Sequence, residues 1–268
     1  MQGEATPHSS GLSLDEATTK AREIVDYAQH NGIPLRLLGA LAITLGSLES
    51  KKHCYLFLQG RVGDQEKPFT DLDFVGYSRD KKKICTLLES LGYRSRGGLT
   101  DLEFGRLVYT DKNGIHVDVF LDTLAMCHTI DFRGRLDLDE ITVPLADLLL
   151  SKMQIVNIDT KDIGDSVCLL LDHEVGTEDQ DMINVRHIAK TLADDWGFYY
   201  TASTNLRKIR NEFRPIYENR ISKEETKELD SKIDVILDAI EREPKPLAWK
   251  MRAKVGPRMK WYQDVDAA

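Results

Sequence analysis

The feature that most constrains the fold is residues 70–76, Thr-Asp-Leu-Asp-Phe-Val-Gly, where two carboxylates stand two positions apart in strand-like sequence. Side chains alternate between the two faces of a strand, so we expect Asp71 and Asp73 on one face and Leu72 and Phe74 on the other, toward a core. Two carboxylates on one face repel each other unless a cation lies between them. Mg²⁺ or Mn²⁺, carried in with a nucleoside triphosphate, suits such hard oxygen ligands.

An Asp-x-Asp spacing alone is equally compatible with a solvated strand edge. Two flanking segments favour the metal-site interpretation. Residues 35–43 form an apolar strand that breaks at Gly39 into a helix-forming run, and residues 114–120 form an apolar strand with Asp118 in its middle. Asp118 could be an exposed strand residue, but its apolar neighbours predict a strand that is mostly buried.

The strand of Asp118 is expected to lie beside the Asp-x-Asp strand. Residues 103–110 and 115–121 flank Asp111-Lys112-Asn113-Gly114, and Asn-Gly is a strong hairpin signal. His116 stands two residues before Asp118 and therefore on the same face, where it either contacts substrate or serves as a structural histidine.

A strand–Gly–helix turn, an Asp-x-Asp strand and a third strand Asp, in this order, resemble the polymerase-beta-like nucleotidyltransferase superfamily. The resemblance implies an α/β (α+β) nucleotidyltransferase fold with a small mixed sheet flanked by helices. It also implies that Asp71, Asp73 and Asp118 hold two metal ions, with Asp118 activating the attacking hydroxyl or acting as its base.

In that superfamily the glycine turn lets backbone amides approach the triphosphate, which assigns this role to Gly39 and Ala40. Members usually carry Gly-Gly or Gly-Ser at the turn, whereas this chain has Gly-Ala. A substitute hydroxyl occurs only at Ser47, further along the helix. The amides at the helix start remain usable for phosphate binding.

From Pro144 onward all signals are helical, which predicts an α/β domain over 1–144 and an all-helical domain over 145–268. Capping-box patterns at 177–180 and 222–225 predict the starts of two of its helices. The segment 245–260 carries six Lys or Arg, no acid and Trp249. This basic tail either holds a nucleic-acid backbone, with aromatic side chains stacking on bases, or packs on the acidic body of the protein.

The helical half contributes a second signature, Lys152 followed by Lys161-Asp162-Ile163-Gly164-Asp165. It resembles the AbiEii toxin family of bacterial toxin–antitoxin systems. The resemblance implies that Lys152 and Lys161 contact nucleotide phosphates, that Asp162 and Asp165 serve the active site, and that an antitoxin protein is a possible partner. Two plainer explanations remain: acids favour the first turn of any helix, and Lys152 fits a solvated helix face.

Composition limits the function classes. With 41% hydrophobic and 30% charged residues the chain is an ordinary globular protein, and its net charge of −8 argues against a protein that coats nucleic acid non-specifically. The N-terminus lacks a signal-peptide layout and no apolar run is long enough to span a membrane, so we expect a cytoplasmic location and no membrane partner. The four scattered cysteines predict reduced thiols.

The sequence therefore predicts a Mg²⁺-dependent nucleotidyltransferase that moves a nucleoside monophosphate from an NTP to a hydroxyl acceptor and releases pyrophosphate. The acceptor is left open among an RNA 3′ end (such as tRNA), a protein side chain and a small molecule. The alternative is a non-catalytic nucleotide- or partner-binding protein on the same fold, which Ala40 motivates.

Overall fold

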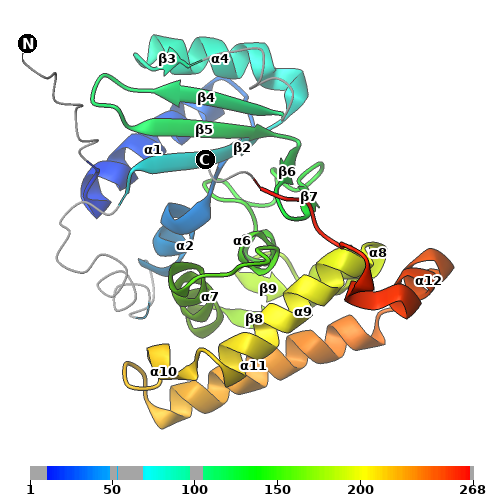
Figure 1. The fold of residues 1–268 in the computed structure, drawn as a ribbon. Coiled ribbons are helices and arrows are strands. Elements are labelled where there is room, and N and C mark those ends of the chain that lie inside the picture. Colours follow the sequence, from blue (N-terminus) through cyan, green and yellow to red (C-terminus); the bar gives the residue numbers. More distant parts are fainter. Residues whose placement is uncertain (1–10, 49–52, 54–68, 97–104, 266–268) are drawn as a thin grey trace, which may run out of the picture.

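The computed structural model describes residues 11–48, 53, 69–96 and 105–265. Its central sheet has the strand order β1-β2-β5-β4-β3 (Figure 1). Strands β2 and β5 are parallel and the other neighbours are antiparallel, which confirms the predicted small mixed sheet. The strands are β1 (Leu35–Leu38), β2 (Asp71–Gly76), β3 (Arg94–Ser95), β4 (Arg106–Thr110) and β5 (His116–Leu121).

Helices α1 (Leu14–His30) and α4 (Lys81–Ser90) belong to the sheet half of the chain, as does α2 (Gly39–Leu48). Helix α1 begins at a capping box: Ser13 accepts from the amide of Glu16, whose carboxylate accepts from the amide of Ser13. One face of the sheet packs on α4, because a Cβ added to Gly76 would lie 2.6 Å from Ile84 Cδ1. Leu72 and Phe74 alternate with the Asp-x-Asp carboxylates and are fully buried.

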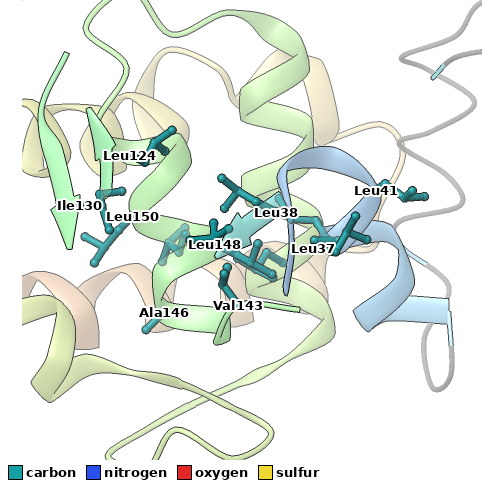
Figure 2. Close-up of a cluster of buried hydrophobic side chains, with 14 of the residues drawn as sticks. Leu37, Leu38, Leu41, Leu124, Ile130, Val143, Ala146, Leu148 and Leu150 are labelled. Atoms are coloured by element: carbon teal, nitrogen blue, oxygen red, sulfur yellow. The ribbon is translucent and has the colours of Figure 1, made fainter. Parts of the chain in front are cut away.

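The two halves of the chain share one hydrophobic core. Figure 2 shows Leu37 and Leu38 of β1 close to Val143 and Leu148, at the start of α6 (Leu145–Met153). Residues 141–143 run beside β1, since Leu37 N donates to Ile141 O at 2.8 Å and Val143 N donates to Leu37 O at 3.0 Å. The hairpin of β6 (Thr123–Ala125) and β7 (Thr129–Asp131) adds Leu124 and Ile130 to this cluster. The predicted join near residue 145 thus coincides with the start of α6, but it lies within a continuous core.

The C-terminal half is mostly helical, with its helices gathered on one side of the sheet (Figure 1). The remaining elements are α7 (Thr160–Asp172), β8 (Glu174–Gly176), β9 (Met182–Asn184), α8 (Val185–Asp194), α9 (Trp196–Asn211), α10 (Arg214–Tyr217), α11 (Lys223–Arg242) and α12 (Leu247–Val255).

The expectation of an all-helical half is wrong at β8 and β9, which form a short parallel pair. The 177–180 pattern does not begin a helix, since Asp179 forms an ion pair with Arg135 at 2.8 Å instead. The next helix, α8, begins at Val185 behind an Asn184 cap. The capping box at Ser222 does begin α11, as predicted.

Two further findings bear on the sequence analysis. Cys168 in α7 is disulfide-bonded, so the expectation of reduced thiols is wrong for this residue, whereas Cys85 and Cys127 are free. In the part of the chain that the structure describes, no helix combines the length and apolarity needed to cross a membrane.

Candidate active site

The three strand carboxylates lie on one face of the sheet. Asp73 on β2 is paired in register with Asp118 on β5, and Asp71 precedes Asp73 by two residues on the same face. All three line a single cleft of about 610 Å³, within the size range of small-molecule sites. The alternation of residues 70–76 therefore places the carboxylates together, as the sequence suggested.

The carboxylates repel one another. Burial, together with the neighbouring charges of Asp71 and Asp118, raises the pKa of Asp73 from its ordinary 3.8 to about 7, although Lys152 and Arg106 act in the opposite direction. The cleft thus holds negative charge that the protein itself compensates only in part.

This pKa predicts a pH-dependent stability for the metal-free protein. Between about pH 4 and 7 the folded state binds more protons at Asp73 than the unfolded chain does, so the contribution of this group to stability falls as pH rises and is constant above that window. We expect the Tm of Asp73→Asn, measured by calorimetry in EDTA, to exceed the Tm of wild type by a margin that grows as pH rises from 4 to 7. A Tm difference that does not change with pH would contradict the raised pKa.

Gly39 forms the turn from β1 into α2 beside these carboxylates. It has a φ of +77°, and a Cβ at this position would lie only 2.8 Å from Asp73 Oδ2. Glycine is therefore required twice, for the left-handed backbone and for the close approach of Asp73. The first amides of α2 consequently lie beside the cleft, where a helix N-terminus favours an anion.

Gly39→Ala should therefore be costly. We expect a loss of about 1–3 kcal/mol in unfolding free energy from the strained backbone, and a displaced Asp73 carboxylate. Urea unfolding measures the first effect and any Mg²⁺-dependent nucleotide binding measures the second. Gly32→Ala is the matched control, because Gly32 has a φ of +64° but nothing within 4 Å of an added Cβ. Equal binding losses in the two variants would contradict a specific role for the contact with Asp73.

Lys152 joins the helical half to the cleft. Its ammonium lies 2.9 Å from both Asp162 Oδ1 and Asp165 Oδ2 on α7, and its side chain is buried. Burial alone would lower the pKa of Lys152, but Asp165 and Asp162 more than offset it and hold the pKa above its usual value. The ammonium is therefore charged throughout the neutral range. Lys152 and Asp162 line the same cleft as the strand carboxylates.

Other predicted site residues lie elsewhere. Lys161 is exposed on the first turn of α7 and is not part of the cleft lining. Ala40 packs partly buried against the hydrophobic core, so only its amide is placed for phosphate binding. Ser47 lies in α2, but its side chain falls outside the described part of the structure.

Sequence reasoning missed two arginines of the cleft, Arg96 and Arg106. Arg106 Nη1 lies 3.4 Å from Asp118 Oδ2. The hairpin register could have revealed it, since pairing Val108 with Asp118 places Arg106, two residues earlier, on the same face. His116 also lines the cleft, as its spacing from Asp118 predicted.

A divalent cation fits this donor set by its chemistry. Among the described residues, no three His, Cys, Asp or Glu side chains are gathered as closely as a bound metal would hold them. The cleft nevertheless offers three carboxylates on one face, and the raised pKa of Asp73 reflects negative charge that such a cation would neutralise. Asp71, Asp73 and Asp118 are the residues that would hold Mg²⁺ or Mn²⁺.

The basic tail and the adjoining Trp261 pack on the body of the protein through aromatic side chains. Trp249 Nε1 donates to Leu192 O at 3.2 Å, and Trp261 Nε1 donates to Thr201 Oγ1 at 3.0 Å. Arg252 lies 4.4 Å above the ring centroid of Trp196. The two tryptophans are thus engaged with the protein, which favours the packed-tail interpretation over base stacking.

No protein-family model matches the chain, and no curated protein matches it in sequence. Several solved structures resemble it, among them the following three. The antibiotic-resistance factor ANT(2'')-Ia has 14% identity and a TM-score of 0.38 over 66% of this chain and 95% of that one. The lincosamide antibiotic adenylyltransferase LnuA has 15% identity and a TM-score of 0.38 over 56% of this chain and 94% of that one. An antigenic nucleotidyltransferase-like protein from Paracoccidioides brasiliensis has 15% identity and a TM-score of 0.39 over 68% of this chain and 89% of that one. Because these TM-scores are low, we base the function on the residues of the cleft.

Proposed function

We propose that the protein is a Mg²⁺-dependent nucleotidyltransferase that moves a nucleoside monophosphate from an NTP to a hydroxyl acceptor. The observation that carries this proposal is the cleft itself. Three carboxylates from the adjacent strands β2 and β5 face the N-terminal turn of α2, with the ammonium of Lys152 in the same cleft. Phosphoryl transfer needs chiefly positioning and charge neutralisation, which this set supplies.

The residues divide the work by position. Amides at the start of α2 cradle phosphate oxygens, and Lys152 adds a fixed positive charge beside them. Asp118 accepts the proton of the attacking hydroxyl. The oxygen of that hydroxyl then bonds to the α-phosphorus, while the bond from the α-phosphorus to the bridging oxygen of the β-phosphate breaks and pyrophosphate is released. Metal ions held by Asp71, Asp73 and Asp118 would supply the remaining neutralisation of charge on the transferring group.

Label transfer tests the proposal. The protein is incubated with Mg²⁺, a cell extract and each α-labelled NTP in turn, and we expect label on an acceptor together with pyrophosphate release. Asp73→Asn should give neither. Nucleotide binding without any transfer would support the alternative, a non-catalytic binding protein, which the Gly39-Ala40 turn keeps open.

The resemblance to AbiEii toxins extends the proposal to a toxin with a cognate antitoxin. The support is the contact of Lys152 with Asp162 and Asp165, three residues of that signature, of which Lys152 and Asp162 line the cleft. Induced expression should then arrest growth of a bacterial host, and Asp73→Asn should abolish the arrest. Normal growth despite demonstrated transferase activity in the cells would contradict the toxin role alone.

A further inference from the structure

The cleft has two walls. One consists of the N-terminal turn of α2 with Lys152, and the other lies on the β4 side of Asp118. Arg106 of β4 is in register with Phe120 of β5, and both project to the same face as Asp118. Arg96 follows β3 and donates its amide to Val108 O at 2.9 Å. Arg96, Arg106 and Phe120 all line the cleft, and we refer to them as the arginine wall.

The two walls differ in charge. Lys152 lines the cleft but already forms ion pairs with two acids on α7. Arg106 is 36% exposed, lies 3.4 Å from Asp118 and has its guanidinium carbon 6.0 Å from the ring centroid of Phe120. Arg96 is exposed, and within the described residues no acid forms an ion pair with it. The arginine wall therefore adds two guanidinium groups to the cleft on the far side of Asp118.

Sheet order assigns the two walls to different substrates. The strands run β1-β2-β5-β4-β3, so the N-terminus of α2, which follows β1, and the arginine wall lie on opposite sides of the β2–β5 carboxylates. In an in-line displacement the attacking and leaving oxygens also lie on opposite sides of the transferred phosphorus. With the pyrophosphate portion at α2 and Lys152, the acceptor approaches from the arginine wall.

The geometry points to an acceptor that carries a phosphate beside its accepting hydroxyl, held by Arg96 and Arg106. This inference rests on the proposed function, because it takes the triphosphate to lie at α2. Guanidinium groups bind phosphate oxygens through paired hydrogen bonds, and the partly buried ring of Phe120 adds an apolar surface to the cleft lining. A polycationic acceptor would meet repulsion at the same wall.

Binding measurements test the inference without requiring turnover. Calorimetry compares two phosphate probes, glycerol 3-phosphate and a dinucleoside monophosphate, with glycerol and adenosine as uncharged counterparts. Each is titrated with and without Mg²⁺ and a non-hydrolysable NTP analogue. The variants are Arg96→Gln and Arg106→Gln, and Arg94→Gln is the control, since Arg94 is exposed on β3 but does not line the cleft.

We expect wild type to bind a phosphate probe more tightly than its uncharged counterpart. Arg96→Gln and Arg106→Gln should each weaken that binding by about tenfold or more, as expected for loss of a charge-assisted hydrogen bond. The affinity of Arg96→Gln for the NTP analogue should stay within about twofold of wild type, and Arg94→Gln should change neither affinity. Tighter binding of the dinucleoside probe would indicate a nucleic-acid strand, and equal binding a small phosphorylated alcohol.

Two results would overturn the inference. One is wild type binding phosphate probes no better than uncharged ones. The other is a loss of NTP-analogue affinity in the arginine variants with probe binding intact, which would assign the arginines to the nucleotide. Failure of the NTP analogue to bind wild type would instead count against the proposed function, and the titrations without analogue would still report on the arginine wall.

Discussion

Asp73→Asn is expected to abolish nucleotidyl transfer and to weaken Mg²⁺-dependent NTP binding while the protein stays folded. Burial and two neighbouring carboxylates raise the pKa of Asp73, and asparagine keeps the shape of the side chain but removes the charge that would hold a cation. We expect at least a hundredfold loss in kcat/KM, because mutating even the residues that support metal ligands typically lowers metal affinity or activity by about 10–100-fold. Label transfer and Mg²⁺-dependent calorimetry provide the measurements.

Asp26→Asn, on the exposed face of α1, is the matched control and should behave like wild type. The same test applies to Asp71→Asn and Asp118→Asn. If the three residues act as a set, these variants should lose a similar share of kcat/KM. Wild-type turnover in Asp73→Asn would remove this residue from the catalytic machinery and with it the metal assignment.

Lys152→Met is expected to reduce both stability and nucleotide binding. It leaves Asp162 and Asp165 facing each other without the ammonium that lies 2.9 Å from both. Breaking a buried ion pair by removing one partner costs about 3–5 kcal/mol. Loss of the phosphate contact should in addition lower kcat/KM by roughly thirty- to hundredfold, through a higher KM and a lower kcat. Urea unfolding and steady-state kinetics measure the two effects separately.

A triple variant, Lys152→Met with Asp162→Asn and Asp165→Asn, separates structure from catalysis. Removing both uncompensated acids should restore most of the lost stability, whereas nucleotide affinity should remain low. Lys161→Met serves as the control on the same pair of helices, because Lys161 is exposed and outside the cleft. Recovery of wild-type kinetics in the triple variant would show that Lys152 is only a structural ion-pair partner.

The local signals of the sequence predicted the carboxylate face well because they depend on short-range geometry. Alternation along β2 placed Asp71 with Asp73, and the Asn113-Gly114 turn joined the strand of Asp118 to β4; Asp111 supports the turn by accepting from the amides of Asn113 and Ile115. The parallel pairing of β5 with β2 is a long-range contact that this turn does not specify. The capping boxes at Ser13 and Ser222 likewise involve residues only three positions apart.

Long-range pairing was not readable in the same way. The 177–180 segment has the residues of a helix start, but Asp179 is drawn to Arg135, 44 positions away, and β8 pairs with β9 nearby. Arg106 is a different case, since the register of β4 against β5 that places it beside Asp118 follows from the local Asn113-Gly114 turn. The exposure of Lys161 follows from the orientation of α7, which the spacing of Lys and Asp residues did not specify.

The contact between Gly39 and Asp73 offers a criterion for judging relatives of this chain. A single added methyl group at position 39 would overlap the carboxylate oxygen of Asp73, so loss of the glycine must displace that carboxylate. A related gene that keeps the Asp-x-Asp pair but has lost the glycine would be expected to encode a degenerate copy or a protein recruited to another task. Inspection of two codons would thus sort family members before any is purified.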